Sequence, residues 1–116
     1  MALPAEIISL AAQVVDDLRA RGETLSTAES LTAGAVSSAI VTIAGASDVF
    51  VGGTTAYRDE IKSSHLGVDP ALIAEHSAIS EEVAIAMAQG ALKSFGTTWA
   101  IAVSYTHLTL PTICSV

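Results

Sequence analysis

The N-terminal part of the chain places apolar residues at helical spacing. Between Ile7 and Leu18 they recur every three or four residues, with charged side chains between them. Pro4 suits the first turn of a helix, and Gly22 suits the position just after the last turn. The pattern therefore predicts a helix that ends near Arg21.

The remaining apolar runs alternate between strand-like and helix-like patterns. Glycines and capping residues separate them, notably Gly67, the pair Asp69 and Pro70, and Ser80. The expected elements, in chain order, are strand 25–29, buried helix 31–43, strand 49–57 with an irregularity at its two glycines, helices 59–66, 70–76 and 80–95, and strand 98–104.

Alternating helices and strands predict one α/β domain, a three-layer α/β/α sandwich with helices on both faces of a single sheet. The 116 residues suffice for one modest core. Apolar residues make up 51% of the chain but aromatic residues only 4%, so the core must consist mainly of Ala, Val, Ile and Leu. Alanine-rich helices packed closely against the sheet suit that composition.

The charge balance narrows the classes of partner. A net charge of −7 disfavours nucleic acid and anionic membranes, because binding phosphate backbones needs clustered Lys and Arg. A small phosphorylated ligand needs only one or two local cations and remains compatible. The single cysteine, Cys114, excludes an internal disulfide, and no Cys/His spacing suggests zinc. The N-terminus lacks the pattern of a signal peptide, and we expect a cytoplasmic protein.

Residues 27–34, with the sequence TAESLTAG, lie where the first expected strand meets the second expected helix. Such a junction places a serine hydroxyl and free backbone amides close together, as acyl-transfer chemistry requires. Ser30 has an alternative role as the N-cap of the helix, its oxygen accepting from a terminal amide. The local sequence alone favours the cap.

Residues 27–34 also resemble the opening motif of the CinA C-terminal domain family, the nicotinamide-nucleotide amidohydrolases. The family pattern reads T-A-E-S-x-T-G-G, and Ala33 replaces the first glycine of its pair. The resemblance continues through further short motifs in the same order and covers nearly all of residues 4–104. These motifs are Gly45-Ala46-Ser47, residues 53–57, Lys62, Leu66-Gly67-Val68, Ser80-Glu81-Glu82-Val83 and residues 99–104.

The resemblance implies an enzyme that converts nicotinamide mononucleotide to nicotinate mononucleotide and ammonia with a Ser/Lys pair. Ser30 takes the position of the nucleophile, and helix N-terminal amides would hold the oxyanion. Lys62 follows Tyr57 at the family's spacing of five residues and takes the position of the base. A lysine base needs surroundings that favour its neutral form, as burial does. The alternative for Lys62 is a solvated helix residue paired with Asp59.

Tyr57 is the third catalytic candidate, because its hydroxyl could relay a proton or orient Lys62; the alternative is a strand-end tyrosine with a buried ring. The expected substrate-binding residues are Glu29, Thr32, Gly34, Thr55 and Arg58. Glu29 could instead support the loop, and Arg58 could instead be an ordinary surface residue. The reaction implied by the resemblance needs no metal or organic cofactor. We expect a mononucleotide substrate, no nucleic acid or membrane partner, and a homo-oligomer when the domain is complete.

The C-terminal end departs from the family pattern. No Asp, Glu, Lys or Arg follows Lys93, and the family's glycine-rich loop is absent after Ser104. Residues 103–112 are what one reading frame of a common transposon sequencing adapter encodes. We therefore expect 1–104 to be a partial amidohydrolase domain and 105–116 a non-native tail, the alternative being a natural edge strand with a loose end. Strand Trp99–Val103 is then expected to lie unpaired along one edge.

A partial domain leaves two further interpretations open beside the enzyme. One is a competence- or damage-linked interaction module, and the other is an inactive fragment of the amidohydrolase. Titration with the mononucleotide separates them, because an intact enzyme releases ammonia, a binder only binds, and a fragment does neither.

Overall fold

The computed structural model describes residues 3–104 and 112–115. Its elements are α1 (Ala5–Arg21), β1 (Leu25–Glu29), α2 (Ala35–Val41), the short 3-10 helix η1 (Ala46–Asp48), β2 (Phe50–Thr55), α3 (Asp59–Leu66), α4 (Pro70–His76), α5 (Glu81–Phe95), β3 (Trp99–Val103) and β4 (Thr112–Ser115). No helix in this described part of the chain has the length and apolar character needed to cross a membrane.

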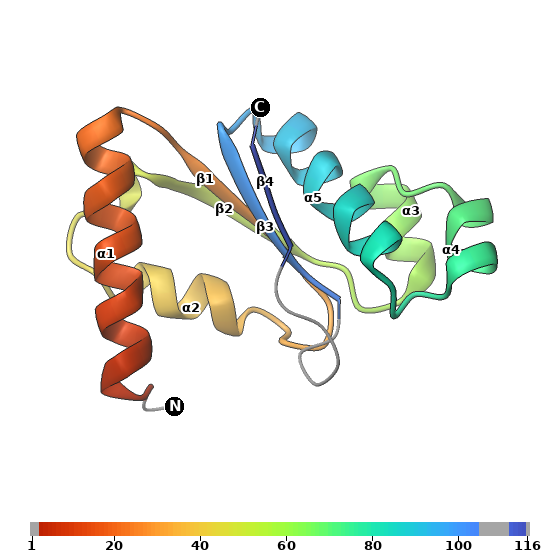
Figure 1. The fold of residues 1–116 in the computed structure, drawn as a ribbon, viewed down its shortest axis with the longest axis horizontal. Coiled ribbons are helices and arrows are strands. Elements are labelled where there is room, and N and C mark those ends of the chain that lie inside the picture. The colour runs from red at the N-terminus through yellow and green to blue at the C-terminus, as the bar shows by residue number, and fades with distance from the viewer. Residues whose placement is uncertain (1–2, 105–111, 116) are drawn as a thin grey trace.

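One sheet forms the middle layer, with strand order β2-β1-β3-β4. The pairs β1–β2 and β1–β3 are parallel, whereas β4 runs antiparallel to β3. Helices α1 and α2 lie on one side of the sheet, and α3, α4 and α5 lie on the other (Figure 1). The predicted α/β sandwich with helices on both faces is confirmed.

Most element boundaries follow the predicted signals. Gly22, Gly67 and Gly96 each follow a helix in the left-handed conformation, which glycine adopts without steric cost. The Asp69 carboxylate accepts from the Ala71 amide, and the Ser80 hydroxyl accepts from the Val83 amide, so the two predicted N-caps are confirmed.

The predicted helix 31–43 is too long, because α2 begins only at Ala35. Residues 31–34 form a turn in which Ala33 and Gly34 both have positive φ, at 51° and 102°. Two successive residues in this conformation interrupt a right-handed helix. β2 contains an irregularity, but it lies at Val51, just before the two glycines where it was expected. Leu25 pairs with Phe50, whereas Ser26 pairs with Gly52 and Thr27 with Gly53.

The two faces of the sheet carry different cores. Against α5 the core is rich in alanine, as predicted, with Ala28, Ala56, Ala88, Ala91, Ala100 and Ala102 among its buried members. Larger residues such as Val15, Leu25 and Ile40 fill the face under α1 and α2. Gly90 of α5 lies against the Leu66 carbonyl, where a Cβ would not fit. This close approach seats α3 on α5 and fixes where the side chains of α3 point.

The expectation that Trp99–Val103 lies unpaired at the edge of the sheet is wrong. β3 lies between β1 and β4, and β4 pairs with it from Ser115 opposite Trp99 to Thr112 opposite Ala102. Backbone atoms of residues from the expected tail therefore cover the edge that an absent segment was expected to cover.

Candidate active site

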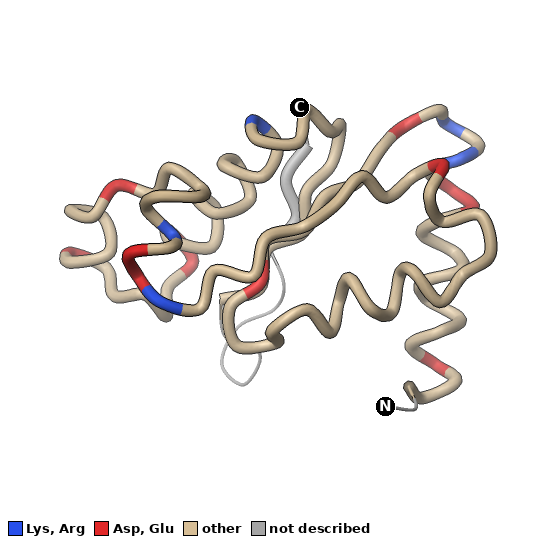
Figure 2. Tube along the Cα trace, turned by 180° about the vertical axis from the view of Figure 1, so that it is seen from behind, with Lys and Arg blue, Asp and Glu red and all other residues tan. Residues whose placement is uncertain are grey.

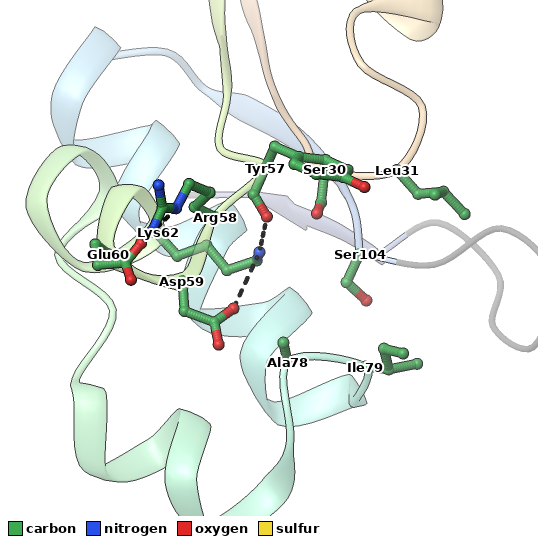
Figure 3. Close-up of a pocket in the computed structure, with 10 residues that line it drawn as sticks. All are labelled: Ser30, Leu31, Tyr57, Arg58, Asp59, Glu60, Lys62, Ala78, Ile79 and Ser104. Atoms are coloured by element: carbon green, nitrogen blue, oxygen red, sulfur yellow. Dashed lines mark hydrogen bonds and ion pairs between the residues drawn. The ribbon is translucent and has the colours of Figure 1, made fainter.

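A cleft of about 450 Å³ opens at the carboxyl ends of β1 and β3. In open α/β sheets this end of the parallel strands is where ligands bind. Figure 3 shows side chains that reach the cleft from β1, from the start of α3, from the segment before α5 and from the end of β3. The lining residues are Ser30, Leu31, Tyr57, Arg58, Asp59, Glu60, Lys62, Ala78, Ile79 and Ser104.

Ser30 directly follows β1, and hydrogen bonds fix its backbone on both sides. Its amide donates to the Val103 carbonyl at 3.0 Å, and its carbonyl accepts from the Ala33 amide at 3.1 Å. The residue is buried, and its hydroxyl faces the cleft (Figure 3). The N-cap interpretation is wrong, because Gly34 occupies that position and α2 begins at Ala35.

The Glu29 carboxylate holds the turn and the start of α2 in place of a serine cap. Oε1 accepts from the Thr32 hydroxyl at 2.8 Å and from the Gly34 and Val36 amides at 3.2 and 2.9 Å. Oε2 accepts from the amide and the hydroxyl of Ser37 at 3.0 and 2.8 Å. Side chains alternate along a strand, so Glu29 points to the α2 face while Ser30 points to the cleft on the other face.

The pKa of Glu29 lies below its ordinary value of 4.5. Burial by itself raises the pKa, since it disfavours the charged carboxylate. Four hydrogen bonds lower the pKa by more than burial raises it. Their donors are the Val36 and Ser37 amides and the Ser37 and Thr32 hydroxyls. The geometry is therefore that of an ionised carboxylate with donors on both oxygens.

Glu29 changes which amides are available near Ser30. The expected oxyanion donors, the N-terminal amides of α2, are occupied, because those of Gly34, Val36 and Ser37 donate to Glu29. The Ala35 amide donates to the Thr32 carbonyl. Within residues 3–104 and 112–115, the amides of Leu31 and Thr32 make no hydrogen bond, and they follow Ser30 directly.

Lys62 is buried, with 2% of its surface exposed, although it lies on a short surface helix. Its Nζ donates to the Tyr57 carbonyl at 2.9 Å and lies 3.5 Å from Asp59 Oδ1. The alternative of a solvated lysine is wrong, while the pairing with Asp59 that it included is present. Ser30 and Lys62 both line the cleft, and Figure 3 shows the Lys62 ammonium group pointing toward the side on which Ser30 lies.

Tyr57 contacts Lys62 through its backbone and not through its hydroxyl. The ring extends away from the Lys62 ammonium group in Figure 3, and the residue is 66% exposed. The alternative of a strand-end tyrosine with a buried ring is therefore wrong. The carbonyl orients Lys62, and any proton relay by the hydroxyl stays a prediction.

Among the residues predicted to bind substrate, Arg58 alone lines the cleft, where its Nε lies 3.1 Å from Glu60 Oε2. Thr32 and Gly34 belong to the turn held by Glu29, and Thr55 lies beside Gly34 at the end of β2. Figure 2 shows that basic residues are few along the trace and that two of them lie close together at the start of α3. Substrate binding by Thr32, Gly34, Thr55 and Arg58 stays a prediction.

Ser104 is a cleft residue that the sequence analysis did not propose. It is buried, and its Oγ has no hydrogen-bond partner among the described residues. Val103 pairs with Glu29, so Ser104 and Ser30 follow neighbouring parallel strands at the same level. That register is the signal that could have identified it. No group of three His, Cys, Asp or Glu side chains in the described residues could hold a metal ion.

Comparisons with known proteins agree with this architecture. The family model of the CinA C-terminal domain matches residues 7–105. A CinA-like protein of Prochlorococcus marinus (strain MIT 9313) is 48% identical over 96 residues, which is 83% of this chain and 22% of that protein. A CinA-like protein of Salinibacter ruber is 42% identical over 105 residues, or 90% and 25%. The chain thus spans about a quarter or less of these two relatives.

Solved structures show the same fold. The competence/damage inducible protein CihA from Agrobacterium tumefaciens superposes with a TM-score of 0.84 at 36% identity, covering 88% of this chain and 62% of that one. A CinA superfamily protein from Escherichia coli gives 0.82 at 30% identity, covering 88% and 60%. The match over residues 7–105 and the shared fold show that this chain belongs to the CinA C-terminal domain family.

Proposed function

We propose that the cleft hydrolyses the carboxamide of nicotinamide mononucleotide, releasing nicotinate mononucleotide and ammonia. The observation that carries the proposal is the convergence of the Ser30 hydroxyl and the buried Lys62 amine on one cleft. A serine becomes a nucleophile when a base close to it takes its proton, and the buried lysine is suited to that role. The family resemblance supplies the substrate.

In the first half of the reaction, the Ser30 oxygen bonds to the carboxamide carbon while its proton passes to Lys62 Nζ. The carbonyl oxygen becomes an oxyanion, held by the amides of Leu31 and Thr32. Donors of this kind are the largest single contribution in many acyl transfers, and the amide that follows the nucleophile supplies one in other serine hydrolases. The carbon–nitrogen bond then breaks, Lys62 returns the proton to nitrogen, and ammonia leaves.

In the second half, water attacks the ester on Ser30. Lys62 takes a proton from that water and returns it to the departing Ser30 oxygen, which releases the carboxylic acid and restores both groups. The buried Lys62 side chain, held by the Tyr57 carbonyl, suits a base that acts twice from one position. Arg58 at the rim of the cleft is the candidate cation for the phosphate of the mononucleotide.

The test measures ammonia and nicotinate mononucleotide after incubation with nicotinamide mononucleotide. It uses two proteins: the 116-residue chain, and an extended chain whose residues 105–116 are replaced by the C-terminal segment of the Agrobacterium relative. We expect equal amounts of both products from the extended chain. Binding of the mononucleotide without either product would favour the interaction module. Neither binding nor products in both proteins would contradict the proposed site.

A further inference from the structure

The Leu31–Gly34 turn depends on one buried side chain, that of Glu29. This carboxylate is 1% exposed, and its two oxygens accept five hydrogen bonds from Thr32, Gly34, Val36 and Ser37. The donors span the whole connection between Ser30 and the first turn of α2. A single anchor therefore fixes both ends of the segment that follows the nucleophile.

The turn also contains a residue in an unfavourable conformation. Ala33 has a φ of 51°, in the left-handed region that glycine adopts freely and alanine avoids. Such a conformation persists only where the surroundings enforce it. Glu29 supplies that enforcement on both sides of Ala33, through the Thr32 hydroxyl and the Gly34 amide.

The same bonds divide the backbone amides into two sets. The amides of Gly34, Val36 and Ser37 point to Glu29, on the α2 face of the sheet. The amides of Leu31 and Thr32 have no acceptor among the described residues. By holding the turn in this form, Glu29 leaves the amides of Leu31 and Thr32, the two residues that follow Ser30, without an acceptor among the described residues.

We infer that Glu29 is a positioning residue for the reaction at Ser30, acting through the turn that presents the Leu31 and Thr32 amides to the developing oxyanion. The inference rests on the proposed function, and it replaces the expectation that Glu29 binds substrate directly. The carboxylate does not line the cleft, so its removal affects the reaction only through the backbone of the turn.

The test uses the extended chain, in which the C-terminal segment of the Agrobacterium relative replaces residues 105–116, and three variants of it. Glu29→Gln removes the negative charge of the carboxylate and replaces one acceptor oxygen by an NH₂ group, which faces the donors of the turn. Thr32→Val removes one hydrogen bond to Oε1 and serves as the milder variant. The matched control is Thr42→Val, which removes one hydroxyl bond, to the Ala39 carbonyl, at the opposite end of α2.

Two measurements are made on each protein. Hydrogen–deuterium exchange reports the protection of residues 31–37. A fluorophosphonate probe reports the oxyanion site, because the serine oxygen bonds to phosphorus, fluoride leaves, and the developing charge on the phosphoryl oxygen needs the same donors. The maximal labelling rate of Ser30 and the half-saturating probe concentration are determined separately.

We expect Glu29→Gln to accelerate exchange across residues 31–37 and to lower the maximal labelling rate by about 10²-fold, as loss of an oxyanion donor does. The half-saturating probe concentration of Glu29→Gln should equal that of the parent. Thr32→Val should lose less of the maximal labelling rate, and Thr42→Val should match the parent in both exchange and labelling. Parental labelling rates in Glu29→Gln, or unaltered exchange, would overturn the inference. A parent that is not labelled at Ser30 would overturn both the proposed function and the catalytic part of the inference. If Glu29→Gln still showed faster exchange in that case, Glu29 would be a structural anchor of the turn alone.

Discussion

Ser30 and Lys62 show how differently two residues of one site depend on the rest of the chain. Ser30 is placed mainly by the strand that it follows, because the end of β1 sets its backbone and one bond to the Val103 carbonyl of the neighbouring strand holds it there. Lys62 is placed by tertiary packing, because α3 reaches the sheet only where Gly90 allows the approach of Leu66. A sequence motif can identify the first kind of position, whereas burial of the second kind emerges only in the folded chain.

Replacing Lys62 by arginine tests its role as a base. Arg keeps the positive charge but does not deprotonate under working conditions, so Lys62→Arg in the extended chain should abolish ammonia release. Asp59→Asn is the matched control, since it removes the 3.5 Å ion pair and leaves the Tyr57 carbonyl in contact with Lys62. Asp59→Asn should keep most of the turnover of the parent. Activity retained in Lys62→Arg would leave Lys62 with a structural role only.

Tyr57→Phe separates the backbone of this residue from its hydroxyl. The Tyr57 carbonyl holds Lys62 and is unchanged in phenylalanine. The exposed ring does not fill the core. We therefore expect turnover close to that of the parent in a steady-state ammonia assay. A loss of several orders of magnitude would show instead that the hydroxyl relays a proton, as the sequence analysis allowed.

At the scale of elements, the turn before α2 is where local sequence rules gave the wrong answer. The Ser30 hydroxyl was interpreted as a cap because serine is a preferred N-cap residue. The actual anchor is Glu29, a residue of the preceding strand that reaches past the turn to Ser37. Rules based on spacing cannot find such a cap, since they assume that the helix begins right after the capping residue.

Ala33→Gly should stabilise the fold. The φ of 51° costs alanine about 1 kcal/mol that glycine does not pay, although glycine loses more backbone entropy on folding and offsets part of the gain. We expect an increase in unfolding free energy of up to about 1 kcal/mol, measured by urea denaturation. The family pattern has glycine at this position, in agreement with this expectation. A destabilised Ala33→Gly variant would contradict the strain assigned to the turn.

Acid should remove the stabilisation that Glu29 provides. Its folded pKa lies below 4.5, so the ionised carboxylate stabilises the fold above that pH, and the contribution is lost as the pH falls through the folded pKa. The difference in unfolding free energy between the parent and Glu29→Gln should be constant above pH 4.5 and narrow below it. Glu6→Gln, on an exposed turn of α1, is the control. A difference that widens on acidification would contradict this assignment.

At the scale of the whole molecule, the alternation of helices and strands predicted the fold class because each apolar run was bounded by a clear stop signal such as Gly22, Gly67 or Gly96. The pairing of β4 with β3 was not predicted. Residues 112–115 follow a proline and have no alternating pattern, so nothing local marked them as a strand. Contact with β3 stabilises a strand that its own sequence does not specify.

Exchanging residues 105–116 for the C-terminal segment of the Agrobacterium relative should change the behaviour of the whole chain. Residues 94–116 carry no Asp, Glu, Lys or Arg, and an uncharged strand at a sheet edge favours association between copies. We expect the 116-residue chain to self-associate and to show little turnover, and the extended chain to be monodisperse and active. Size-exclusion chromatography with the ammonia assay checks both properties. A monodisperse and fully active 116-residue chain would contradict the expectation of a non-native tail.

The most direct test of the central claim, that Ser30 is the nucleophile of an amidohydrolase, is ammonia release by Ser30→Ala in the extended chain. Ser38→Ala is the matched control, because Ser38 is exposed on α2 and does not line the cleft. We predict that Ser30→Ala folds like the parent and loses ammonia release by several orders of magnitude, about 10⁶-fold where a nucleophilic serine is removed, while Ser38→Ala keeps parental turnover. Turnover near the parental rate in Ser30→Ala would contradict the account.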